Sequence, residues 1–84
     1  MSQDELSNHD AFIAAKQRGL LLLLKTLKDE SEAIEIRAAA AEGLGYSGGR
    51  RALEALQAVA EKPSEYGHVK SACLIALGRA MKPQ

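Results

Sequence analysis

The residues best suited to binding chemistry form a glycine-rich turn followed by two arginines. The segment 45–49 reads GYSGG, and Arg50 and Arg51 follow it at the start of an expected helix. Free backbone N–H groups at a helix N-terminus and two guanidinium groups could together bind an anion. The segment lacks the strand and the Gly-Lys-Ser/Thr ending of a nucleotide-binding P-loop. We therefore consider Gly48, Gly49, Arg50 and Arg51 a candidate anion site, with a helix terminator and flexible turn as the alternative.

Three further side chains could do chemistry, namely His9, His68 and Cys73. A metal site needs three or four convergent ligands, and no cluster of His, Cys and Asp has a suitable spacing in this sequence. Cys73 lies on an apolar stripe without a nearby histidine, so we expect an inert thiol in the core. The sequence thus predicts no catalytic residue, no metal and no cofactor.

Composition and charge restrict the partners and the location. The 84 residues include 11 Lys and Arg against 11 Asp and Glu, and a chain without net positive charge is a poor candidate for nucleic-acid binding. The single cysteine fits a reducing cytosol. The acidic start does not resemble a secretory signal, and the apolar run 20–24 is too short to span a bilayer. We expect a cytoplasmic protein with no membrane segment.

The elements that must position these residues are indicated by an internal repeat. Residues 36–45 read IRAAAAEGLG and residues 69–78 read VKSACLIALG, at a constant offset of 33 residues. The likeness extends to the alignment of 17–47 with 50–80, in which leucines, serines and glycines recur at expected core, capping and terminating positions. A fixed period between about 20 and 50 residues is typical of a solenoid.

Apolar spacing and capping residues divide each repeat into two helices. We expect first helices over about 10–28 and 50–61. The second helices are expected to begin after Ser31 and Ser64, whose side chains would act as N-caps. Gly45 is expected to end the earlier of the two by adopting a left-handed conformation.

The expected fold class is therefore all-α, an α-solenoid of two stacked helical hairpins with four helices in total. Residues 1–9 are expected to be a polar, disordered segment before a single domain over 10–82. Unit one of this domain covers 10–47 and unit two covers 48–82. The second helix is expected to bury a stripe of four residues, namely Ile36, Ala40, Gly43 and Leu44.

Each second helix follows one pattern: an apolar residue, Arg or Lys, one residue, Ala, and finally Leu-Gly. This pattern resembles HEAT-like repeats, most of all the short bacterial type of the phycobilisome lyases, over about residues 11–82. The resemblance implies that a turn Asp and the Arg of the second helix bond each other, here Asp29 and Arg37. Unit two has Lys62 and Lys70 at these positions, so the same bond is not expected there.

Two enzymes of this repeat class are disfavoured by the same comparison. The metal-dependent hydroxylase that acts on deoxyhypusine carries His-Glu after the Arg, where this chain has Ala38-Ala39 and Ser71-Ala72. The helical-repeat DNA glycosylases also resemble this class, but this chain has no Trp to stack on a base and no concentrated basic groove. An auxiliary protein related to the bilin lyases, or a fragment of a larger enzyme complex, is an alternative that rests on resemblance alone.

Both outer helices carry more apolar residues than two hairpins need. Leu21, Leu22 and Leu24 align with two polar residues and one alanine, and Leu74 and Ile75 align with an alanine and a glutamate. A helix that is apolar on every side must be covered on every side. Either the N-terminal segment folds back over this surface, or another protein binds it.

We therefore predict a non-catalytic protein–protein interaction module or small scaffold that self-associates or docks on a larger protein. A variant of this prediction is an adaptor that binds a peptide or helix along the second helices. The candidate interface consists of Leu21, Leu22, Leu24, Arg37, Glu42, Lys70, Leu74 and Ile75.

Overall fold

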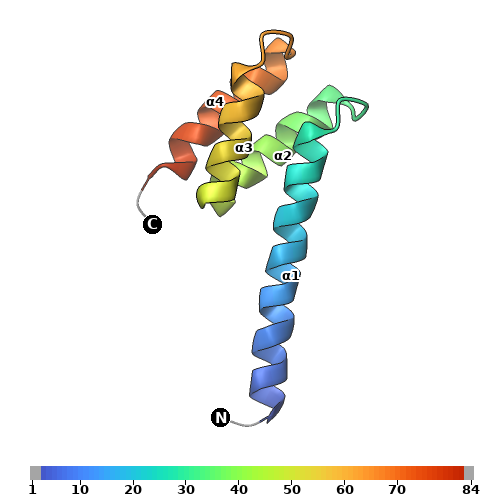
Figure 1. Ribbon diagram of the computed structural model, residues 1–84, viewed down its shortest axis with the longest axis vertical. Coiled ribbons are helices and arrows are strands. Elements are labelled where there is room, and N and C mark those ends of the chain that lie inside the picture. The colour runs from blue at the N-terminus through green and yellow to red at the C-terminus, as the bar shows by residue number, and fades with distance from the viewer. Residues whose placement is uncertain (1–2, 83–84) are drawn as a thin grey trace.

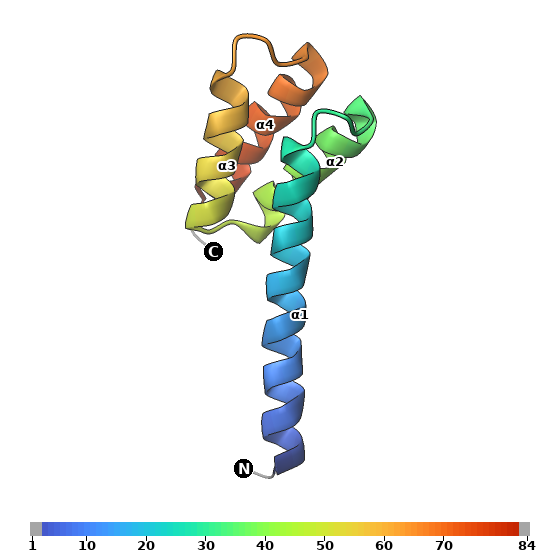
Figure 2. The ribbon, with the colours of Figure 1, turned by 45° about the vertical axis from the view of Figure 1, so that its right-hand side comes forward.

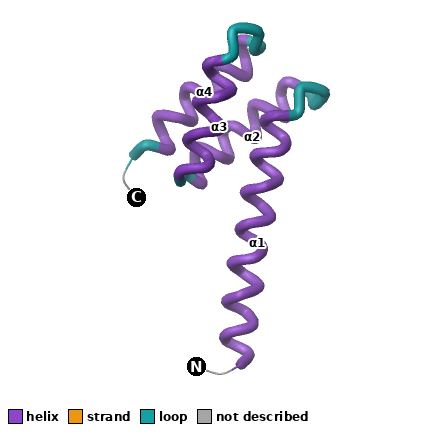
Figure 3. Tube along the Cα trace, in the orientation of Figure 1, coloured by secondary structure: helices purple, strands orange, loops and turns teal. Residues whose placement is uncertain are grey.

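The computed structural model describes the backbone of residues 3–82 and the side chains of residues 8–82. Four helices make up the fold, and no strand occurs among these residues (Figures 1 and 3). They are α1 (Gln3–Lys28), α2 (Ile34–Ser47), α3 (Arg50–Glu61) and α4 (Gly67–Ala80). The predicted all-α class with four helices is confirmed, and so are the predicted bounds of the third helix.

The four helices form two hairpins that lie side by side, α1 with α2 and α3 with α4 (Figures 1 and 2). The second helices of the hairpins, α2 and α4, make the largest contact in the molecule, whereas the first helices, α1 and α3, contact each other only slightly. The N-terminal part of α1 projects beyond the other helices (Figure 1). The two units are therefore joined mainly through their second helices.

The core lies between the hairpins and is built from leucines and small residues. Leu27, Leu44, Leu56, Val69 and Cys73 are fully buried. The alanines at 40, 41, 52, 55 and 76 are buried among them, which lets the helices pack at close range. The chain therefore needs no large aromatic ring to fill its interior.

The first helix is longer than the sequence suggested. It begins at Gln3 rather than near Asp10, so residues 3–9 are helical and the expectation of a disordered segment there is corrected. Residues 1 and 2 of that segment lie outside the described part of the chain. Neither Gly nor Pro occurs between residues 3 and 18, so nothing in the local sequence interrupts the helix.

The predicted serine caps are also wrong. The residues before α2 and α4 are Ala33 and Tyr66, and neither helix has a side-chain cap at its N-terminus. Ser31 instead donates from its backbone nitrogen and from its Oγ to Oδ1 of Asp29, at 3.0 and 2.6 Å. The aspartate thus closes a turn before the helix starts, as short polar side chains often do.

Gly45 does not end the second helix. The helix continues to Ser47 and stops at Gly48, whose φ of 62° lies in the left-handed region. A Cβ on Gly45 would lie 2.9 Å from the Cα of Ala76 in α4. Gly45 is therefore needed because α4 lies too close to this point of α2 for a side chain to fit.

Candidate interaction surface

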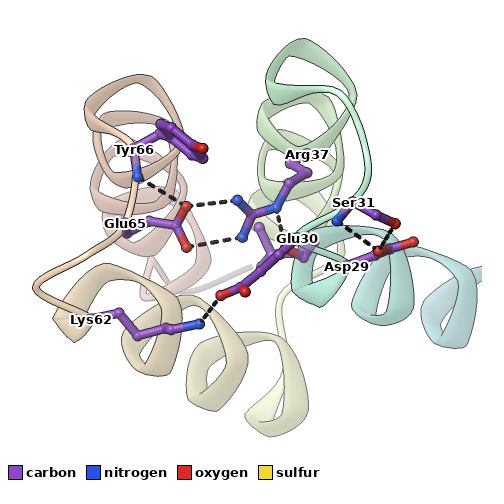
Figure 4. A network of polar contacts seen from close by, with 8 residues as sticks. Asp29, Glu30, Ser31, Arg37, Lys62, Glu65 and Tyr66 are labelled. Carbon is purple, nitrogen blue, oxygen red and sulfur yellow. Dashed lines mark hydrogen bonds and ion pairs between the residues drawn. The ribbon is translucent and has the colours of Figure 1, made fainter.

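A buried ion pair between Arg37 of α2 and Glu65, just before α4, connects the two units (Figure 4). Nη1 and Nη2 of Arg37 donate to Oε1 and Oε2 of Glu65 at 2.7 and 2.9 Å. Nε of Arg37 donates to the backbone oxygen of Leu27 at 2.9 Å. Both charged side chains are 2% exposed. Arg37 therefore joins the two units and is not available as the interface residue that we predicted.

The charges of this pair support each other. Hydrogen bonds from Arg37 lower the pKa of Glu65 below the usual range of a glutamate, although burial acts in the opposite direction. The same hydrogen bonds raise the pKa of Arg37. The Glu65 carboxylate also accepts a hydrogen bond from the backbone nitrogen of Tyr66 at 3.1 Å. The pair is therefore ionised and held by two-point geometry, which favours one relative placement of the units.

The bond between Asp29 and Arg37 that the family resemblance implied does not form. Hydrogen bonds from Ser31 occupy Asp29 and lower its pKa. At the position matching Asp29 in unit two, Lys62 reaches back to Glu30 with Nζ 2.5 Å from Oε1 (Figure 4). This second pair is exposed. The recurrence of glutamate at positions 32 and 65 was the sequence signal that could have identified the true partner of Arg37.

The predicted apolar interface is largely exposed. Leu21 and Leu22 on α1 are open to solvent, and so are Leu74 and Ile75 on α4. Leu24 is the exception, because it is buried in the core against α3 and only 7% exposed. Leu24 is thus removed from the candidate interface as a core residue.

The polar members of the predicted interface differ from each other. Glu42 is exposed on α2, and Lys70 is half-buried on α4. Ile36 was expected in the core, but it is 49% exposed. Several other exposed apolar side chains were not predicted as interface residues, namely Phe12, Ile13, Tyr46, Tyr66 and Met81.

Two groups of the candidate anion site are engaged in other contacts. The backbone nitrogen of Gly48 donates to the backbone oxygen of Leu44 at 3.0 Å. Nε of Arg50 lies 2.9 Å from Oε1 of Glu54, four residues along α3. Gly49 has a φ of 88° and leads directly into the helix. These contacts support the alternative of a helix terminator and turn, and anion binding by Gly48, Gly49, Arg50 and Arg51 stays a prediction.

Cys73 lies in the core, as its position on the apolar stripe predicted. Burial raises the pKa of its thiol to about 11, so the reactive thiolate is scarce at neutral pH. His9 and His68 are both exposed. No group of three or more His, Cys, Asp or Glu residues in the described part of the chain could hold a metal ion.

Between residues 3 and 82, no helix combines the length and the apolar character that a membrane span needs.

Comparison with known proteins gives one family. The family described as HEAT repeats matches residues 19–84, which is all of the chain except its first 18 residues. No curated protein and no solved structure gives a significant match. The match is to HEAT repeats in general and does not single out the short bacterial type. With two helical hairpins stacked through their second helices, the chain belongs to the HEAT repeat family.

Proposed function

We propose that this chain is a non-catalytic protein–protein interaction module, which associates with itself or docks on a larger protein through its outer helices. The observation that carries the proposal is the exposure of large apolar side chains on both outer helices. Leu21 and Leu22 are 51% and 64% exposed on α1, and Leu74 and Ile75 are 55% and 57% exposed on α4. Grouped exposed apolar residues typically mark an interaction site.

The repeat shows that the fold does not require these apolar side chains. Leu21 and Ile75 correspond to Glu54 and Glu42, which lie on the same faces of α3 and α2 and are exposed as well. A hairpin that tolerates glutamate at these positions has no folding reason to place leucine or isoleucine there. Binding to another protein supplies such a reason, since burial of each apolar side chain then becomes favourable.

The family supports the same class of function. HEAT repeats commonly mediate protein–protein interactions and are generally a non-catalytic repeat fold. The balanced charge makes a nucleic-acid partner unfavourable, and one reduced, buried thiol suits the cytoplasm. No feature of residues 8–82 favours the alternative of an auxiliary protein related to the bilin lyases, or a fragment of a larger enzyme complex.

Affinity capture with charged variants tests this proposal. Leu21, Leu22, Leu74 and Ile75 are each replaced by Glu in one variant, and the tagged protein is compared with the tagged wild type in an extract that also contains an untagged copy. We expect the wild type to retain at least one protein, which can be the untagged copy, and the variant to lose it by about tenfold or more.

The matched control carries four glutamates at exposed polar positions, namely Asn8, Gln17, Gln57 and His68. It should retain the same proteins as the wild type, because it changes the charge by a similar amount while leaving the apolar surface intact. Circular dichroism checks that both variants are folded. If the apolar-to-Glu variant retains every protein that the wild type retains, the proposal is wrong.

A further inference from the structure

The interface between the two units is formed by one surface of unit one and a different surface of unit two. Because the units are repeats, unit two carries a second copy of the first surface and unit one a second copy of the other, and both copies are largely exposed at the ends of the molecule. We infer that the chain stacks head-to-tail on a second copy of itself, in the register that places unit two on unit one. This inference rests on the proposed function and names the partner. The trailing face is defined here as Lys70, Ser71, Leu74 and Gly78 of α4, together with Met81 just after that helix. The leading face comprises Gly19 and Leu22 of α1, Glu32 of the following turn, and Ile36 and Ala39 of α2.

The trailing face matches the face of α2 that unit two covers. Its five residues correspond, 33 residues earlier, to Arg37, Ala38, Ala41, Gly45 and Gly48, all of which are buried. Arg37 and Gly45 on that face contact Glu65 and Ala76 of unit two. In unit two the same positions are exposed apart from the half-buried Lys70, with Leu74 55% and Met81 61% exposed.

The leading face shows the converse. Its counterparts in unit two are Ala52, Ala55, Glu65, Val69 and Ala72, which are buried or half-buried. Val69 is 0% exposed, whereas the corresponding Ile36 is 49% exposed. Leu22 is 64% exposed where its counterpart Ala55 is 4% exposed. Unit one therefore presents the surface that unit two uses to bind it.

The exposed halves keep the chemistry of the covered interface. Lys70 replaces Arg37 and Glu32 replaces Glu65, so the cation stays on the trailing face and the carboxylate on the leading face. Leu74 and Ile36 provide apolar side chains on opposite faces. The two faces are thus complementary in charge and in apolar character, which favours contact between unlike ends.

Gly78 would allow the backbone of a second copy to approach α4 as closely as α4 approaches α2. Its counterpart Gly45 has no room for a Cβ because Ala76 lies against it. A Cβ on Gly78 would meet nothing within 4 Å, and a glycine in an open helix is unfavourable for folding. Contact with a second copy explains the glycine, since Gly43 is the residue that would stand where Ala76 stands in the covered interface.

The geometry of this contact differs from that of a symmetric dimer. A head-to-tail contact uses two different faces, so each added copy leaves one leading and one trailing face free. Leu21 and Ile75 lie outside both faces, because their counterparts Glu54 and Glu42 stay exposed when the units stack. These two residues therefore distinguish stacking from unspecific apolar association.

Sedimentation velocity over a micromolar concentration series tests the inference on the full chain. We expect the wild type to form species that grow with concentration. Leu74→Glu blocks the trailing face and Ile36→Glu blocks the leading face, so each variant alone should associate at least about tenfold more weakly. A mixture of the two variants retains one free leading face and one free trailing face, and it should form a dimer that grows no further.

Two control variants keep the stacking faces intact. Leu21→Glu and Ile75→Glu should associate like the wild type, although they remove apolar surface of similar size.

Charge reversal within the two faces gives a further test. Glu32→Lys and Lys70→Glu should each weaken association, because each variant places two like charges opposite one another. A mixture of the two variants pairs opposite charges again, so association should recover. All of the substituted residues are exposed or half-buried, and thermal unfolding confirms that the variants are folded.

Several results would overturn the inference. One is a wild type that stays monomeric through the series, and another is Ile36→Glu or Leu74→Glu that alone associates like the wild type, which would indicate a symmetric dimer. A mixture of these two variants that stays monomeric would also contradict it. If the wild type is monomeric but captures a different protein through Leu21, Leu22, Leu74 or Ile75, head-to-tail stacking is wrong and the interaction module stands.

Discussion

Gly45 and Gly78 occupy the same position in α2 and α4, yet only Gly45 has another helix packed against it. A Cβ on Gly45 would lie 2.9 Å from α4, whereas one on Gly78 would meet nothing within 4 Å. Both helices are 14 residues long, and on the same side Arg37, Ala38 and Ala41 of α2 are buried, whereas Lys70, Ser71 and Leu74 of α4 are half-buried or exposed. The comparison shows that α2 and α4 carry two copies of the same surface. The copy on α2 is buried because unit two stacks on it, and the copy on α4 stays exposed.

Arg37 and Lys70 show how the difference changes side-chain chemistry. The guanidinium of Arg37 is buried and donates hydrogen bonds to both carboxylate oxygens of Glu65. Lys70 stands at the open end and is half-buried. Arginine suits buried two-point pairing because the donors of its guanidinium group form a rigid fork. The ammonium group of lysine is strongly hydrated and ends a flexible side chain, so lysine suits a position in contact with water. Each residue therefore fits the solvent exposure of its own copy.

The largest difference between the units should appear when these two cations are removed. Arg37→Ala leaves the buried Glu65 carboxylate without its partner, which should lower the free energy of unfolding by about 3–5 kcal/mol. Lys70→Ala removes a half-buried charge that forms no ion pair with residues 8–82, and the change should stay within about 0.5 kcal/mol. Urea titration followed by circular dichroism measures both.

The double variant Arg37→Leu with Glu65→Leu sharpens this test. It removes both charges, so it should be more stable than Arg37→Leu alone, because no unpaired charge remains buried. Equal destabilisation by Arg37→Ala and Lys70→Ala would show that the buried pair does not distinguish the two units.

The two glycines should respond to alanine with opposite signs. Gly45→Ala forces a Cβ against the backbone of Ala76 and should destabilise the fold by about 1–3 kcal/mol. Gly78→Ala meets no atom and should stabilise it by about 0.5–1 kcal/mol, since alanine favours a helix. Thermal unfolding at low protein concentration checks both signs. Destabilisation by Gly78→Ala under these conditions would mean that α4 is not open on this face.

Acid should weaken the joint between the units. Because Arg37 lowers the pKa of Glu65 in the folded chain, the pair contributes its full stability above the unfolded pKa of about 4.3. That contribution is lost as the pH falls through the lowered pKa of the folded state. Asp29, whose pKa is lowered by Ser31, acts in the same direction.

The measurement is the free energy of unfolding from urea titrations between neutral and strongly acidic pH. Glu65→Gln should make this pH dependence shallower, whereas Glu32→Gln, at the corresponding exposed position of unit one, should leave it close to that of the wild type. A slope that Glu65→Gln does not change would assign acid sensitivity to other carboxylates.

Among the ion pairs that join the units, the smaller effect should come from the exposed pair of Glu30 and Lys62. Both side chains remain accessible to water, so Lys62→Ala should cost about 0–1 kcal/mol and the cost should shrink at high salt. Arg37→Ala, measured beside it at the same salt concentrations, should keep most of its effect. If Lys62→Ala destabilised the chain as much as Arg37→Ala, the joint would not depend on the buried pair.

Local patterns in the sequence were enough to predict several features. The 33-residue offset predicted two similar units, and apolar spacing predicted four helices with the correct bounds for α3. The exposed ion pair between Arg50 and Glu54 likewise requires only a spacing of four residues within one helix. These features depend on neighbours within a turn or two of helix, whose geometry is the same in every α-helix.

The partner of Arg37, the burial of Leu24 and the role of Gly45 could not be predicted in the same way. Each depends on how one hairpin lies against the next, and the residues that meet there are far apart in sequence, as Arg37 and Glu65 are. The sequence by itself determined a repeated surface with cations, glycines and leucines at equivalent positions. Only the tertiary structure decided which copy of that surface is covered, because burial depends on the neighbouring helix and not on the residue's own type.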